Sequence, residues 1–222
     1  MNILRINEKV HPVYWVHNFL SDNEIEKIKK YTEDILEEDA QVGEKFREEE
    51  KKPFTVEYHI KDPNIGKVPR KRIANIKWIE LNSETNWLYK KIINQIHKVN
   101  QENFDMILKF VENLQFSEYT ESQQGFYTKH NDCGDKGELE NFVDIRKLSF
   151  SIQLTDKKEY EGGELEFQCR NLDDPTHTRL CTEIMPKGSI VVFPSFVWHR
   201  VKPVTKGRRY SLVVWHLGEP FR

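Results

Sequence analysis

The chain has 222 residues, a length that suits one domain with a sizeable core. Hydrophobic residues make up 37% of it and charged residues 32%, and 34 basic and 36 acidic side chains leave a formal net charge of -2. A balance this even argues against nucleic acid as a partner. No stretch approaches the roughly 20 apolar residues that cross a bilayer, so we expect no membrane partner either. Cys133, Cys169 and Cys181 have the spacing of neither a disulfide framework nor a zinc site, which indicates free thiols and a cytoplasmic location.

Two helices are predicted in the first half of the chain. Ser21 to Glu24 has the spacing of a capping box, so the first helix begins there. The second begins near Ser83 and carries an apolar stripe between Trp87 and Val99. Between them, residues 37–52 are charged and lack an apolar period, which favours a solvated surface loop. The alternative is a lid that contacts substrate.

Strands are predicted from residue 72 onward. Alternating or continuous apolar runs predict them over 73–79, 104–119 with a break near 112–113, 148–154, 164–167, 189–193, 199–204 and 209–217. Glycine-containing turns separate them at 162–163, 186–188 and 205–207. Short strands at this spacing predict a mainly β sandwich or jelly roll over 104–222. Residues 1–103 would supply helices and flanking strands that buttress one face of it.

His130 and Asp132, followed much later by His199, form a candidate metal site. Residues two apart in an extended strand point to the same side, so His130 and Asp132 would share an interior face that His199 joins from another strand. Two imidazoles and a carboxylate suit iron(II), manganese or zinc, and leave other positions on the ion open. The alternative is a surface His–Asp pair and an unrelated core histidine.

Arg209 begins an apolar strand and is a candidate carboxylate receptor. An arginine that faces a core is costly unless an anion meets it. Alternation places Ser211 on the same side and points Arg208 to solvent. Tyr119 or Tyr127 would add a donor, although Tyr127, three residues before His130, need not share its face. The alternative for Arg209 is an exposed arginine at a strand edge.

The second half carries a series of short motifs in a fixed order. They are QFSEY at 115–119, YTKHND at 127–132, KLSFSIQLT at 147–155, YEGGEL at 160–165, PKGS at 186–189, FPS at 193–195 and HRVKPVTKGRRY at 199–210. Taken together, these motifs resemble the iron(II)- and 2-oxoglutarate-dependent dioxygenases of the prolyl hydroxylase type, in particular their bacterial and phage branch.

The resemblance implies a double-stranded β-helix core in a single catalytic domain over residues 1–222. It implies that His130, Asp132 and His199 bind iron(II), and that Arg209 binds the distal carboxylate of 2-oxoglutarate. Tyr119 and Tyr127 match tyrosines that line the pocket in the family, while Gln153 stands where some relatives have a tyrosine. Which of these three supplies the second donor to 2-oxoglutarate stays open.

The same resemblance implies hydroxylation of a C–H bond, with oxygen consumed, 2-oxoglutarate converted to succinate and ascorbate as a candidate reductant of the iron. A prolyl residue in a protein or peptide is the favoured substrate, and a free amino acid or another small metabolite is the alternative. Two other interpretations remain, a non-catalytic jelly-roll binding module and a zinc hydrolase. Neither of them explains Arg209. Trp198 and Trp215 are candidates for the wall of the substrate pocket. The alternative is that both side chains only pack in the core. The polar segment 133–146 is a candidate lid.

Overall fold

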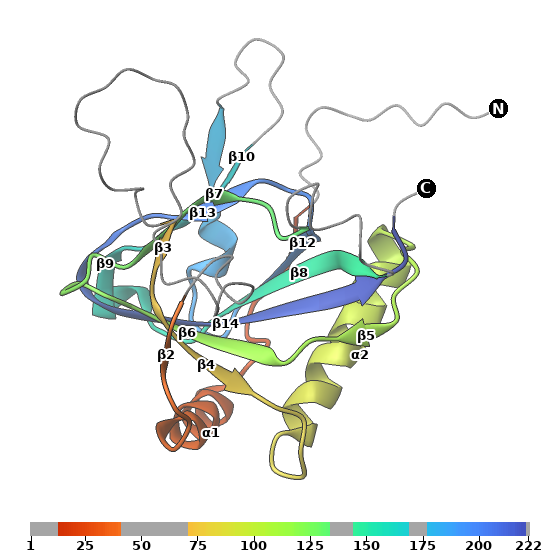
Figure 1. Ribbon diagram of the computed structural model, residues 1–222, viewed down its shortest axis with the longest axis horizontal. Coiled ribbons are helices and arrows are strands. Elements are labelled where there is room, and N and C mark those ends of the chain that lie inside the picture. The colour runs from red at the N-terminus through yellow and green to blue at the C-terminus, as the bar shows by residue number, and fades with distance from the viewer. Residues whose placement is uncertain (1–12, 41–70, 134–143, 169–176, 221–222) are drawn as a thin grey trace, which may run out of the picture.

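Two β-sheets face each other in the computed structural model of the chain, with two helices against the larger sheet (Figure 1). The structure describes residues 13–40, 71–133, 144–168 and 177–220. The predicted jelly roll is confirmed, as is the break of the 104–119 segment near residues 112–113. None of the helices in this described part of the chain has the length and hydropathy of a membrane span.

The larger sheet has nine strands. Its main path runs β1 (Tyr14–Val16), β12 (Ile190–Pro194), β8 (Ile145–Gln153), β14 (Val204–Gly218), β6 (Leu114–Thr120), β4 (Asn75–Ile79) and β2 (Glu38–Asp39), and two further strands, β5 (Phe110–Val111) and β9 (Tyr160–Gly162), pair with β14. Strand β14 is the longest and lies at the centre of the sheet, where it contacts four other strands.

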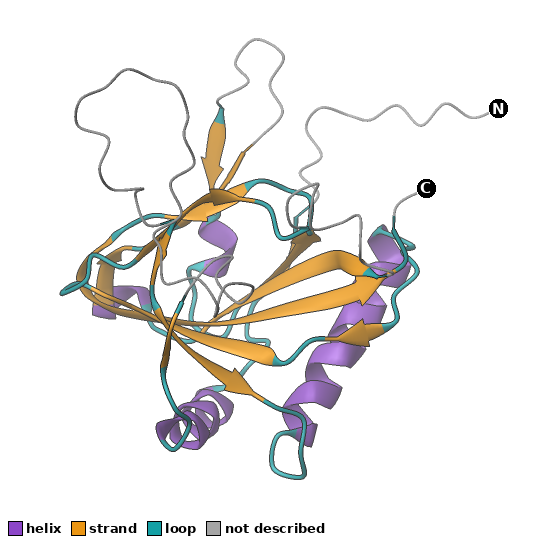
Figure 2. Cartoon of the chain, viewed as in Figure 1, coloured by secondary structure: helices purple, strands orange, loops and turns teal. Residues whose placement is uncertain are grey.

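The smaller sheet has five strands and covers one face of the larger sheet (Figure 2). Its order is β11 (Thr178–Leu180), β10 (Leu165–Gln168), β13 (His199–Val201), β7 (Phe126–His130) and β3 (Arg72–Ile73). Short 3-10 turns, η1 (Lys157–Glu159) and η2 (Thr182–Ile184), precede β9 and β12 respectively.

Both helices cover the outer face of the larger sheet, as the sequence predicts. Helix α1 (Asp22–Glu33) begins with the expected capping box, in which the Ser21 hydroxyl and the Glu24 carboxylate each accept from the other residue's backbone N–H. Helix α2 (Asn86–Asn103) begins later than predicted. The Asn82 side chain accepts from the backbone N–H groups of Glu84 and Thr85 and holds residues 82–85 in a turn.

Alternation along the central strands divides the interior into two cores. Leu212 and Val214 of β14 point outward and pack with α1 and α2 in the first core. Arg209 and Ser211 lie on the opposite side, which faces the smaller sheet. The second core fills the space between the two sheets and includes Phe167, Phe193 and Tyr119. Polar residues that share the side of Arg209 therefore face an enclosed interior.

Two local predictions are wrong. Residues 205–207 form no turn, because β14 continues through them and Gly207 has a φ of +70°. A Cβ atom at Gly207 would lie 2.2 Å from the backbone oxygen of Glu159, so the end of η1 approaches β14 too closely for a side chain. Residues 38–39 of the predicted surface loop form β2 instead. The rest of that loop from residue 41, and residues 134–143 of the candidate lid, lie outside the described residues.

Candidate functional site

The three predicted metal ligands meet between the two sheets. His130 ends β7 and lies opposite His199 of β13 in the strand register. Asp132 follows β7 and is held by its backbone N–H, which donates to the Ser195 carbonyl at 2.8 Å. One side-chain nitrogen or oxygen from each of the three residues lies within 4.8 Å of the other two. The predicted convergence of these side chains is therefore present.

Hydrogen bonds fix the tautomer of both histidines. The Nδ1 of His130 lies 2.7 Å from the Thr128 carbonyl, and the Nδ1 of His199 lies 2.9 Å from the Val197 carbonyl. A carbonyl can only accept, so each Nδ1 carries the proton and each Nε2 keeps its lone pair. The Nε2 atoms face Asp132 at 3.5 and 3.7 Å. Two imidazole nitrogens and a carboxylate thus present lone pairs to one point, which is the donor set that a divalent metal requires.

The protonation states also suit a metal. Burial raises the pKa of Asp132, but the neighbouring His199 and His130 outweigh it and hold that pKa well below its usual value. Burial lowers the pKa of His199 to about 4, against the opposing effect of Asp132. At neutral pH, Asp132 is therefore ionised and His199 is neutral, as metal ligation demands.

Aromatic rings enclose the triad. The Tyr127 ring stacks on the His130 ring with their centroids 3.4 Å apart. Strand alternation does not predict this contact, because Tyr127 and His130 are three residues apart in the chain. The pairing of β7 with β13 is irregular between His199 and Val201, so the side chains of β7 do not alternate regularly there. This irregularity lets Tyr127 and His130 share one side of the strand. On the other side, Phe193 meets the His199 ring edge-on at 4.9 Å.

Arg209 is buried, as predicted, with 2% of its surface exposed. It lies opposite Tyr119 of β6, and its Nη1 has no hydrogen-bond partner among the described residues. Arg208 points the other way and pairs with Glu118 at 3.1 Å. Gly163, with a φ of +62°, makes room for the arginine, because a Cβ there would lie 3.1 Å from the Arg209 Cδ. The fold therefore buries the Arg209 guanidinium and leaves one of its N–H donors without a hydrogen-bond acceptor among the described residues.

Gln153 and Ser211 share the face of Arg209, but the amide nitrogen of Gln153 is already engaged, and only its buried Oε1 has no partner among the described residues. Its Nε2 donates to the Thr155 carbonyl at 3.0 Å and to the Tyr160 hydroxyl at 2.8 Å. The Tyr160 hydroxyl accepts this bond and keeps its own proton to donate. Tyr160 Cε2 lies 3.5 Å from the position of a Gly163 Cβ, close to the Arg209 stem. Tyr160 is thus a donor that the sequence reasoning did not single out.

Two more arginines near the triad were not predicted. Arg146 of β8 forms a two-bond ion pair with Glu112, at 2.7 and 2.6 Å, and its guanidinium lies 3.8 Å above the Trp215 ring. Arg72 of β3 lies 4.8 Å from the Tyr127 ring. Alternation on β3 alone could not show that Arg72 faces inward, since that strand has only two residues.

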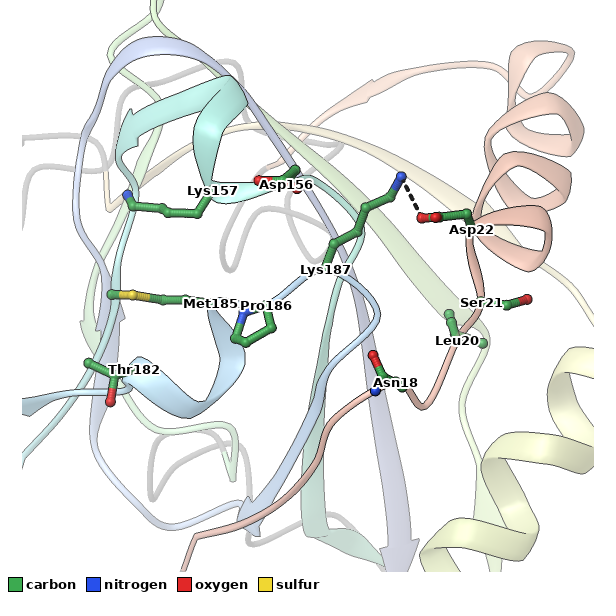
Figure 3. A pocket seen from close by; sticks show the side chains of 10 residues that line it. All are labelled: Asn18, Leu20, Ser21, Asp22, Asp156, Lys157, Thr182, Met185, Pro186 and Lys187. Carbon is green, nitrogen blue, oxygen red and sulfur yellow. Dashed lines mark ion pairs between the residues drawn. The ribbon is translucent and has the colours of Figure 1, made fainter.

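The two candidate tryptophans differ in placement. Trp215 is buried on the interior face of β14, whereas Trp198 is 45% exposed, so its role in a substrate pocket stays a prediction. A separate open depression of about 780 Å³ lies between the β1–α1 connection and the turn before β12 (Figure 3). Asp22 and Lys187 pair across it at 2.9 Å. No residue of the triad lines it.

Comparisons with known proteins agree with this geometry. The family model described as the 2OG-Fe(II) oxygenase superfamily matches residues 114–217, which include the triad and Arg209. Residues 114–217 are therefore similar to this superfamily over slightly less than half of the chain. A PKHD-type hydroxylase of Gloeothece citriformis is 38% identical to the chain over 105 residues, which cover 47% of the chain and 42% of that protein. Another, from Hyphomonas neptunium, is 40% identical over 68 residues, 31% of the chain and 27% of that protein. The chain thus matches less than half the length of these relatives.

Solved structures of prolyl hydroxylases share the fold of most of this chain. A prolyl-4-hydroxylase of Pseudomonas putida aligns with a TM-score of 0.59 and 18% identity, over 93% of this chain and 92% of that one. A prolyl hydroxylase of Trichoplax adhaerens, solved with a peptide of hypoxia inducible factor, aligns with a TM-score of 0.63 and 16% identity, over 92% of this chain and 83% of that one. The chain therefore shares the fold of these solved prolyl hydroxylases.

Proposed function

We propose that this protein is an iron(II)- and 2-oxoglutarate-dependent dioxygenase that hydroxylates a prolyl residue of a protein or peptide. The single observation that carries the proposal is the pairing of a buried triad, with both Nε2 atoms and the carboxylate aimed at one point, and a buried arginine with an unfilled donor. In this proposal His130, Asp132 and His199 hold the metal. Bound iron(II) would supply the oxidising power for a C–H bond: one atom of oxygen enters the substrate as a hydroxyl group, the other enters succinate, and 2-oxoglutarate loses carbon dioxide.

The chain's own residues bind and orient the cosubstrate. Arg209 holds the distal carboxylate, since a guanidinium in a dry site is the side chain best suited to a carboxylate. Ser211 and Tyr119 flank it on the neighbouring register positions. The Tyr160 hydroxyl, which Gln153 orients, supplies the second donor to that carboxylate in our proposal. Gln153 acts through Tyr160 and not by direct contact, because both its N–H groups are used.

The proposed prolyl pocket lies on the other side of the triad. Tyr127 and Trp215 would line it with the parts of their rings that His130, Arg72 and Arg146 leave uncovered, and aromatic surfaces suit a pyrrolidine ring. Arg146 lies over Trp215, and its Nε and Nη2 are held by Glu112, so its Nη1 can donate to a peptide carbonyl. Prolyl hydroxylases among the fold neighbours, one of them solved with a peptide, support this choice of substrate.

We propose that residues 1–222 act as one catalytic domain, since α1 and α2 share a core with strands of the oxygenase domain. A cytoplasmic setting is supported by Cys133 and Cys181, which are free thiols. Cys169 lies outside the described residues. Ascorbate as the reductant of the iron rests on family resemblance alone.

Product analysis tests the proposed reaction. Protein purified without oxygen is loaded with iron(II) and given 2-oxoglutarate, air and a panel of prolyl, lysyl and asparaginyl peptides beside free amino acids. We expect mass spectrometry to show one added oxygen atom on a prolyl peptide, matched by succinate. An added oxygen on a free amino acid alone would move the substrate to the small-molecule class. Cleavage that needs neither oxygen nor 2-oxoglutarate would indicate a hydrolase and contradict the proposal.

Changing Tyr160 to phenylalanine tests the second donor. Loss of one hydrogen bond to a charged carboxylate is worth roughly 1.5–3 kcal/mol, so we expect the Kd of 2-oxoglutarate to rise about 10- to 100-fold. Isothermal titration calorimetry on the manganese(II)-loaded protein measures this without turnover. The matched control is Tyr31→Phe, whose hydroxyl bonds Asn82 outside the site and should leave the Kd unchanged. Equal affinities for wild type and Tyr160→Phe would remove Tyr160 from the cosubstrate site.

A further inference from the structure

Arg72 of β3 lies beside the metal-ligand triad and reaches from the smaller sheet to the larger one. It pairs with Tyr127 in the register of β3 and β7, and its guanidinium carbon lies 4.8 Å from the Tyr127 ring. The same ring stacks on His130 at 3.4 Å. One aromatic ring therefore contacts both this guanidinium and a proposed metal ligand.

The contacts of Arg72 cross to the larger sheet and leave a donor unfilled. Its Nη2 donates to the Ser117 hydroxyl at 3.1 Å and to the Tyr119 hydroxyl at 3.4 Å. Its Nε is buried and has no hydrogen-bond partner within the described segments. A buried N–H without an acceptor costs free energy, which an oxygen of a bound ligand would recover.

Tyr119 lies between two guanidinium groups. The guanidinium carbon of Arg72 is 5.9 Å from the Tyr119 ring, and that of Arg209 is 5.8 Å from it. Each arginine has one buried nitrogen without a partner among the described residues. Two guanidinium groups beside one ring repel each other. Two negatively charged groups of a bound ligand would offset that repulsion. The arrangement suits a ligand with a carboxylate at each end.

The two arginines occupy different ends of this arrangement. Arg209 lies on the β9 side, where its stem passes Gly163. Arg72 lies on the Tyr127 and His130 side. We propose that Arg72 binds the metal-side carboxylate of the 2-oxo acid, the end opposite to the one that Arg209 binds. This inference rests on the proposed function and adds to it a second arginine that selects for the cosubstrate.

A comparison of two ligands tests the assignment of ends. Oxalate presents the metal-side half of 2-oxoglutarate and lacks the distal arm. In manganese(II)-loaded protein without oxygen, we expect Arg72→Met to raise the Kd of both ligands by the same factor, about 10- to 100-fold for a lost charge-assisted bond. Arg209→Met should weaken 2-oxoglutarate alone. Calorimetry provides the Kd values, and no turnover is required.

Controls separate binding from folding. The manganese(II) affinity of Arg72→Met must equal that of wild type, which shows that the triad is intact. Arg208→Met removes an exposed arginine and should change neither ligand's Kd. Arg72→Lys keeps the charge and provides the test if Arg72→Met does not fold. It should bind both ligands more weakly than wild type, because a single ammonium cannot reproduce the fork.

Three results would overturn the inference. Both Kd values within twofold of wild type would show that Arg72 does not touch the cosubstrate. Weakened 2-oxoglutarate with unchanged oxalate would place Arg72 at the distal end. Unchanged Kd values with a raised KM for a peptide would assign Arg72 to the substrate. Failure of the proposed function itself looks different, because wild-type protein would then bind no 2-oxoglutarate in a manganese-dependent manner.

Discussion

Replacing His199 with alanine is expected to abolish turnover. His199 presents an unprotonated Nε2 to the point where the triad converges, so its loss leaves two donors for the metal. A metal that supplies several kcal/mol of catalysis is then held poorly, and we expect succinate formation to fall at least about 1,000-fold. Succinate release and bound iron per chain are measured on the same samples.

The control for this change is His17→Ala, which removes a histidine whose ring bonds the Glu183 carbonyl outside the triad. It should retain wild-type iron content and turnover. Thermal unfolding of the His199→Ala protein shows whether the fold survives. Turnover at the wild-type rate in His199→Ala would mean that the metal ligands have been misassigned.

Replacing Arg209 with methionine should weaken the binding of 2-oxoglutarate without lowering the free energy of unfolding. The distal carboxylate loses a charge-assisted, two-bond partner, so the Kd of 2-oxoglutarate is expected to rise about 100-fold. The free energy of unfolding should stay equal or increase, because a buried cation with an unfilled donor is exchanged for an apolar side chain of similar length. Calorimetry and thermal unfolding in the absence of ligand measure the two effects.

Arg208→Met is the matched control, since the neighbouring residue points outward and pairs with Glu118. It should leave the affinity for 2-oxoglutarate unchanged. An unchanged affinity in Arg209→Met would exclude Arg209 from the cosubstrate site. A large loss of stability in that variant would show instead that Arg209 is satisfied by the fold and supports it.

The sequence predicted those parts of the site that follow from strand alternation. Arg209 and Ser211 share one side of β14 and Arg208 takes the other, as a period of two requires. The capping box of α1 was readable for a similar reason, because it depends on residues three apart. The convergence of His130 and Asp132 with His199, which is far away in the chain, was predicted from residue types and family resemblance and not from any local pattern.

The parts that were missed depend on contacts between distant segments. Tyr160 lies on a strand of three residues, too short for a periodic signal, and its role follows only from the amide of Gln153. Arg72 sits on a two-residue strand, and the face it takes is set by pairing with β7. The stacking of Tyr127 on His130 requires the irregular register of β7 and β13, which no single strand encodes.

The central claim is that His130, Asp132 and His199 bind one metal ion with a 2-oxo acid beside it. Diffraction from crystals grown without oxygen with manganese(II) and 2-oxoglutarate, recorded for the anomalous signal of manganese, tests it most directly. We expect one anomalous peak within bonding distance of both Nε2 atoms and the Asp132 carboxylate, with density for the acid reaching Arg209. A peak elsewhere, or none at the triad of well-ordered crystals, would contradict the claim.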